Sequence, residues 1–70
     1  MTPREALNRL EFYDILCLQN VANGKGKTNK ESLETLTNLG LIFTIDGRYR
    51  TSDLGGQVLK LHSETGRKND

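Results

Sequence analysis

The stretch from Thr28 to Gly55 constrains the fold most, because signals for a helix, a hairpin and a second helix follow one another without a gap. The first segment has leucines at a helical period, which predicts a helix from Asn29 to Leu39 with one core face. These leucines are Leu33, Leu36 and Leu39. Thr28 and Glu31 have the spacing of a capping box, so we expect Thr28 to cap this helix.

A β-hairpin is predicted next. Gly40 suits the left-handed conformation that ends a helix. The run Leu41–Ile45 is apolar and β-branched, which predicts a strand. Asp46-Gly47 is typical of a two-residue hairpin turn, and the returning strand is Arg48–Thr51.

The same pattern places charge on this hairpin. In a two-residue hairpin Ile45 faces Arg48 and Phe43 faces Arg50, so both arginines project from one side, while Tyr49 lies on the other side with Thr44. This basic side favours contact with nucleic acid. The alternative is that the arginines only protect an edge strand from pairing with another sheet.

Length and composition limit the remaining choices. Seventy residues form one small domain, and 34% of them are apolar, so a homodimer interface is a possible source of further buried area. The net charge is +1, from ten basic and nine acidic residues, and therefore only local clustering favours nucleic acid. Cys17 has no partner for a disulfide, and no apolar run approaches the roughly 20 residues of a membrane span. We expect a cytoplasmic protein with no membrane contact.

The amino-terminal segment predicts a helix from Pro3 to about Asn23, opened by a capping box between Thr2 and Glu5. An alternative divides it near Glu11 into two short helices. One face gathers the expected core residues Ala6, Leu7, Leu10, Tyr13, Cys17, Leu18 and Val21. Asp14 lies near this face, where we expect a buried or edge hydrogen bond.

Apolar side chains also leave the opposite side of this helix. They are Phe12, Ile15, Leu16 and Ala22. A helix that is apolar nearly all round is usually covered on more than one side. We therefore expect Phe12, Ile15 and Leu16 to meet the carboxy-terminal helix, a second copy of the chain or another partner.

The segment 23–30 is a basic, glycine-containing loop with Lys25, Lys27 and Lys30 and no acidic residue. It predicts phosphate contacts next to a helix start; the alternative is a solvated turn. Gly26-Lys27-Thr28 resembles the end of a P-loop, but Val21 stands where that motif requires glycine and no strand precedes it. Nucleotide hydrolysis is therefore not expected.

A last helix is predicted after Ser52 or Asp53, either of which can cap it. Leu54, Val58 and Leu61 share its core face. The domain then covers residues 1–62, and residues 63–70 form a flexible polar tail. The predicted fold class is mainly α with one small β-hairpin.

Together these motifs resemble the winged-helix family of DNA-binding domains over residues 30–59. The resemblance rests on Leu33, Leu36, Leu39-Gly40-Leu41-Ile42, Asp46-Gly47-Arg48-Tyr49, Thr51 and Gly55. It implies that Asn29–Leu39 is a recognition helix and that Ile42–Thr51 is a wing. Winged helices normally carry a supporting helix before the recognition helix, and Val21–Thr28 has no room for one. Either the first segment is two helices, or this is a reduced version.

The exposed side of the expected recognition helix is mixed. Glu31 and Glu34 disfavour phosphates, and among base edges they suit only the cytosine amino group. Contacts from the first turn remain, where Thr28, Asn29, Lys30 and Ser32 lie at the positive end of the helix.

Catalytic signals are weak. His62 is the only histidine, and no zinc-ligand spacing or nucleophile with a visible base is present. We expect a non-enzyme without metal or cofactor.

Two functions remain. The first is a small regulator that binds double-stranded DNA through Lys25, Lys27, Thr28, Asn29, Lys30, Ser32, Arg48 and Arg50. It would act as a repressor, antirepressor or excision-type factor of a phage or mobile element. The second is a winged-helix protein-interaction module that acts as an inhibitor or adaptor, using the apolar back of the first helix and Glu31 and Glu34.

Overall fold

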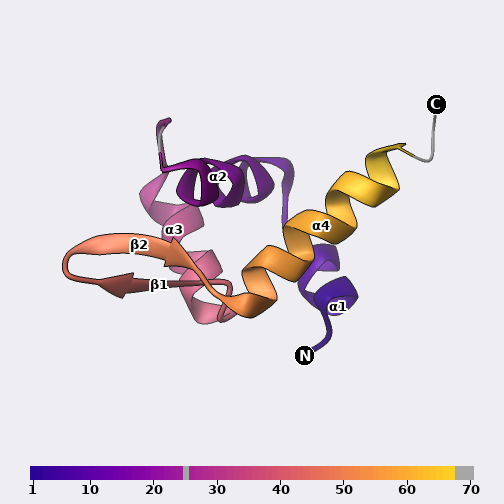
Figure 1. The fold of residues 1–70 in the computed structure, drawn as a ribbon, viewed down its shortest axis with the longest axis horizontal. Helices are drawn as coiled ribbons and strands as arrows, with labels where there is room; N and C mark the ends of the chain where they lie inside the picture. The colour runs from indigo at the N-terminus through magenta and orange to yellow at the C-terminus, as the bar shows by residue number, and fades with distance from the viewer. Residues whose placement is uncertain (25, 68–70) are drawn as a thin grey trace.

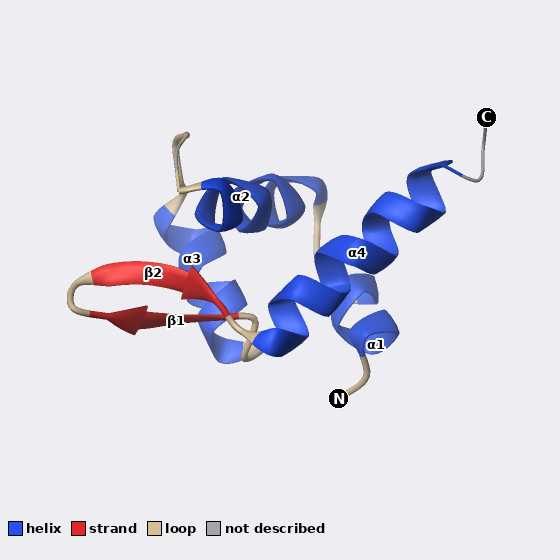
Figure 2. Ribbon diagram, in the orientation of Figure 1, coloured by secondary structure: helices blue, strands red, loops and turns tan. Residues whose placement is uncertain are grey.

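The computed structural model describes residues 1–24 and 26–67, in which the chain is mainly helical with one antiparallel hairpin. The elements are α1 (Pro3–Asn8), α2 (Phe12–Asn23), α3 (Lys30–Asn38), β1 (Ile42–Ile45), β2 (Arg48–Thr51) and α4 (Asp53–Arg67) (Figures 1 and 2). α2 packs against α3, and α1 packs against α4. The hairpin extends from the end of the molecule opposite α1 (Figure 1).

The amino-terminal segment is two helices, so the prediction of one helix from Pro3 to Asn23 is wrong and the alternative break near Glu11 is confirmed. Arg9 caps the end of α1, and Glu11 is the extended residue that precedes α2. The Asp14 carboxylate accepts a hydrogen bond of 3.0 Å from the Glu11 backbone N–H. This bond satisfies a donor that a new helix start leaves without an intrahelical partner, which explains why Asp14 lies buried near the core.

α3 begins one residue later than expected. Asn29, not Thr28, is its N-cap, and the Asn29 side-chain oxygen accepts from the Glu31 N–H at 2.9 Å. The predicted Thr28 cap is therefore wrong: an amide oxygen one position later occupies the capping site. The helix ends at Asn38, followed by Leu39 as C-cap and Gly40 with φ of 75°, as expected for a glycine stop.

The predicted hairpin and its register are confirmed, with Ile45 opposite Arg48 and Phe43 opposite Arg50. Asp46 and Gly47 both have positive φ, 51° and 75°, as the mirror-image hairpin turn requires. Leu41 lies outside the strand and is fully buried.

α4 is capped by Ser52, whose hydroxyl oxygen accepts from the Gly55 N–H at 3.1 Å and donates to the Gly40 carbonyl at 2.5 Å. One side chain thus ties the start of α4 to the end of α3. The helix continues through Arg67, into residues that the sequence assigns to a polar tail; residues 68–70 lie outside the described residues.

The core lies where α1, α2, α3 and α4 meet the base of the hairpin. It consists of Ala6, Cys17, Leu18, Val21, Leu36, Leu41, Ile42 and Val58. Cys17 is a buried free thiol, as expected for a small apolar core residue. Within the described residues, no helix has the length and apolar character needed to span a membrane.

Candidate functional site

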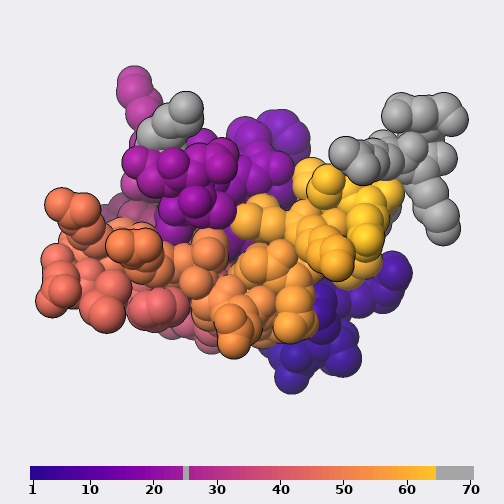
Figure 3. Space-filling model, viewed as in Figure 1, coloured from indigo at the N-terminus to yellow at the C-terminus, as the bar shows by residue number. Residues whose placement is uncertain are grey.

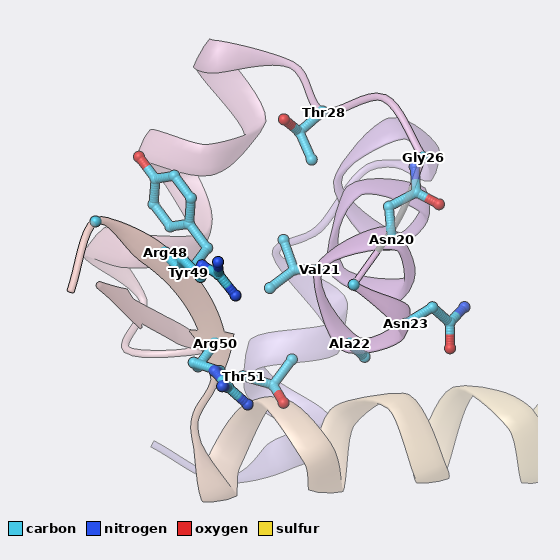
Figure 4. A pocket seen from close by; sticks show the side chains of 12 residues that line it. Asn20, Val21, Ala22, Asn23, Gly26, Thr28, Arg48, Tyr49, Arg50 and Thr51 are labelled. Atoms are coloured by element: carbon cyan, nitrogen blue, oxygen red, sulfur yellow. The ribbon is translucent and has the colours of Figure 1, made fainter. Parts of the chain in front are cut away.

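A groove of about 810 Å³ separates the end of α2 from the hairpin strand β2 (Figure 4). Its walls are Asn20–Gly24, Gly26, Thr28 and Gly47–Thr51. The charged side chains among these residues are the arginines Arg48 and Arg50, and the polar ones are amides, hydroxyls and the Tyr49 phenol. The groove therefore carries positive charge and hydrogen-bond donors without a carboxylate in its lining.

The α2 wall is shaped by the way α2 ends. Gly24 is the left-handed C-cap with φ of 70°, and the chain then turns back toward α3. The Asn20 side-chain N–H₂ donates to the Lys27 carbonyl oxygen at 2.7 Å, which fixes the returning loop against α2. Gly26 has φ of 97°, and a Cβ there would stand 2.7 Å from the Asn20 side chain. Glycine at position 26 thus permits the Asn20 bond.

The opposite wall is the outer edge of β2. Arg48 and Arg50 are exposed and border both this groove and the hairpin face that also carries Phe43 and Ile45. Tyr49 points the other way, toward α3 (Figure 4). It lines a separate hollow with Lys30, Leu33, Glu34, Thr37 and Asn38. The hairpin therefore presents arginines on one face and a tyrosine over α3 on the other.

The structure divides the predicted DNA-contacting residues between three places. Thr28 joins Arg48 and Arg50 at the groove. Lys27 and Asn29 line a neighbouring hollow beside α2, and Lys30 lies with Tyr49 over α3. Lys25 lies outside the described residues.

Ser32 does not belong to this surface. It is only 3% exposed, because its position in α3 faces the interior with Leu36. The prediction that Ser32 contacts DNA from the first turn is therefore corrected: a buried hydroxyl does not reach a ligand outside the helix.

The predicted interface residues of α2 are partly exposed. Phe12 is 70% and Leu16 is 42% exposed, and Ile15 is half-buried. Tyr13, which the sequence places on the core face, is instead 64% exposed. Cys17, Leu18 and Val21, predicted on the same face, are buried as expected, so the error concerns Tyr13 alone, which lies at the edge of that face in the first turn of α2.

Sequence reasoning also missed Asn20 as the residue that holds the loop. Its contact with Lys27 spans seven positions across a turn, and no local pattern indicates such a contact. Among the described residues, no group of three or more His, Cys, Asp or Glu side chains is arranged to hold a metal ion.

What the fold and the groove define is a small domain of helices and one hairpin with a positively charged cleft. No protein-family model, no curated protein and no solved structure matches this chain.

Proposed function

We propose that this protein is a small winged-helix DNA-binding protein, acting as a transcriptional regulator of the kind carried by phages or mobile elements. The observation that carries the proposal is the groove between α2 and β2, which has Arg48 and Arg50 in its walls and no carboxylate among the described residues that line it. Cationic and neutral donor groups without a competing anion are what a phosphate backbone requires.

The order of elements supports the same reading. Three helices precede the hairpin, and a fourth follows it. Because the amino-terminal segment divides in two, α2 takes the place of the supporting helix and packs against α3. The division of the amino-terminal segment therefore supports the proposal, because the winged-helix pattern includes a helix before the recognition helix.

Phosphate contacts would come from the groove, through Arg48, Arg50 and Thr28. Arginine suits this role because its planar guanidinium presents several donors in a fixed arrangement. Base contacts would come from the exposed face of α3 around Lys30 and Asn38, since an asparagine amide can pair with adenine in the major groove.

The arginine face of the hairpin also carries apolar side chains. Phe43 is 45% and Ile45 is 52% exposed, and each lies opposite one of the arginines in the hairpin register. Apolar groups beside cations are the combination with which proteins enter the minor groove. We assign this face of the wing to minor-groove or backbone contact.

The test is fluorescence anisotropy with a labelled random duplex at several salt concentrations. The double variant Arg48→Ala/Arg50→Ala should keep its fold, because both side chains are exposed, and should lower the slope of log affinity against log salt by about 1.8. The matched control is Arg4→Ala/Lys60→Ala, which removes the same charge from exposed positions on α1 and α4. Figure 3 shows α1 at the end of the molecule away from the hairpin.

The proposal predicts binding by the wild type and the control, with a smaller salt slope for the groove variant. If the wild type does not bind at low salt, the groove is not a DNA surface. The same conclusion follows if both double variants lower the slope of log affinity against log salt by the same amount.

A protein-interaction module is the second candidate, and the exposed carboxylates Glu31 and Glu34 on α3 favour it. A basic protein surface would complement them, with the chain acting as an inhibitor or adaptor. This reading predicts no duplex binding at low salt and retention of a basic partner that Glu31→Gln/Glu34→Gln abolishes.

A further inference from the structure

Large apolar side chains are exposed on the outer face of α2. Phe12, Tyr13 and Leu16 are 70%, 64% and 42% exposed on this one helix. Phe12 and Leu16 are four residues apart and therefore lie one above the other on the helix surface. Large apolar groups gathered in this way mark an interaction site more often than single exposed side chains do.

A hollow lies beside this face, on the side of α2 that meets the loop before α3. Tyr13, Leu16, Cys17, Asn20 and residues 27–29 line it, and its volume is about 260 Å³. An apolar cavity of about 150 Å³ already accepts a benzene ring. The hollow is therefore large enough for a phenylalanine side chain.

The projecting side chain and the hollow lie on the same helix, and the hollow extends from Tyr13, next to Phe12, to Asn20. Phe12 precedes Asn20 by eight residues, about 12 Å along the axis. A two-fold dimer requires such a self-complementary surface, because each copy must offer both halves of the contact.

We propose that a second copy of this chain docks antiparallel on the outer face of α2, with the two-fold axis near Leu16. Phe12 of each copy then enters the hollow of the other, between Leu16 and Asn20, and the two Leu16 side chains meet at the axis.

The charges at the two ends of this face agree with the arrangement. Glu11 is exposed immediately before Phe12, and Lys27 lines the hollow. An antiparallel pairing brings Glu11 of one copy near Lys27 of the other, twice in each dimer. A parallel pairing would instead place like charges side by side.

The first test is sedimentation equilibrium of the full chain, without DNA, from micromolar to millimolar concentration. We expect the mass to rise toward twice that of the chain as concentration increases. Phe12→Ser should raise the dissociation constant about thirtyfold, the effect of removing an aromatic anchor from the centre of an interface. The matched control is Phe43→Ser, which makes the same chemical change at an exposed position of the hairpin. Circular dichroism verifies that both variants remain folded.

A charge exchange tests the register. Glu11→Lys and Lys27→Glu should each weaken the dimer, and the double variant should restore it, because the two pairs are exchanged rather than broken. Three outcomes would overturn the proposal. The wild type could stay monomeric at every concentration, or Phe12→Ser and Phe43→Ser could change the dissociation constant equally. The Glu11→Lys/Lys27→Glu variant could also form a dimer no tighter than that of either single variant. None of these outcomes depends on DNA binding, so the dimer and the proposed function are tested independently of each other.

Discussion

Gly55 lies with its α-carbon against the backbone carbonyl oxygen of Leu41, so closely that a Cβ at position 55 would collide with that oxygen. The same oxygen accepts a hydrogen bond of 2.9 Å from the Ser52 N–H. The first turn of α4 is therefore fixed to the residue that leads into β1. This contact holds the base of the hairpin to the first turn of α4.

Replacement of Gly55 by alanine should destabilise the protein by about 1–3 kcal/mol, the usual cost of forcing a methyl group into occupied space. Gly56→Ala is the matched control, because no group from elsewhere in the fold lies within 4 Å of a Cβ there. We expect Gly56→Ala to stabilise the helix by about 0.5–1 kcal/mol, since alanine loses less conformational entropy than glycine. Urea unfolding followed by circular dichroism measures both, and equal effects would contradict the close contact.

Loss of the Asp14 carboxylate should weaken the start of α2. Asp14→Ala leaves the Glu11 N–H without its acceptor, and we expect a loss of about 1 kcal/mol in the free energy of unfolding. Asp14→Asn keeps an oxygen at that position and should lose less. Thermal unfolding of the two variants distinguishes these outcomes, and an Asn variant as unstable as the Ala variant would show that the charge matters more than the hydrogen bond.

Asn20→Ala should release the loop that carries Lys27 and Thr28. The variant loses one side-chain hydrogen bond, worth about 1 kcal/mol, and the loop amides should exchange with solvent faster. Asn23→Ala is the control, because Asn23 lines the same groove at the end of α2. Hydrogen exchange measured by NMR reports the loop directly. Unchanged exchange in Asn20→Ala would mean that another contact holds the loop.

Glu5 predicts a pH effect at the start of α1. The Thr2 backbone N–H donates to the Glu5 carboxylate at 3.0 Å, and the Thr2 hydroxyl accepts from the Glu5 N–H. Thr2 holds the pKa of Glu5 below its ordinary value of 4.5. The hydrogen bond from the Thr2 backbone is the larger cause, and the Thr2 side chain is the next. Because the pKa of Glu5 is lower in the folded state, the ionised carboxylate stabilises α1 fully at a pH above the ordinary pKa of 4.5. This stabilisation is lost as the pH falls through the lower pKa of the folded state.

An NMR titration of the Glu5 side chain measures that pKa. Thr2→Ala should bring it part of the way back toward the ordinary value, because the backbone donor remains while the hydroxyl is lost. Thr2→Ser keeps the hydroxyl and should leave the pKa lowered. If Thr2→Ala and Thr2→Ser titrate alike, the hydroxyl does not contribute.

Local patterns predicted most of the elements but misplaced two helix starts. The hairpin register followed from Asp46-Gly47, because a two-residue turn permits only one pairing. The break at Glu11 was harder to predict, since the apolar positions on both sides continue a helical spacing. At that break the Asp14 carboxylate accepts a hydrogen bond from the Glu11 backbone N–H, which stabilises the start of a new helix. At α3, Thr28 and Asn29 were both suitable caps, and the final geometry of the loop selected Asn29.

The candidate site was predictable only in part. The arginines of the hairpin share one face because strand alternation requires it. That Thr28 joins Arg48 and Arg50 across a groove depends on how α2 packs against the hairpin, which no local spacing contains. Ser32 was misassigned for the same reason: the rotation of α3 about its axis is set by its contact with α2.

The sequence by itself determined the order of elements, the hairpin turn and the sides of the hairpin, because each follows from backbone preferences and side-chain periodicity within a few residues. The tertiary structure alone decided which charged residues meet, which face of α2 stays uncovered and why glycine stands at position 55. These depend on contacts between residues far apart in the chain, and such contacts are selected by the packing of the whole core.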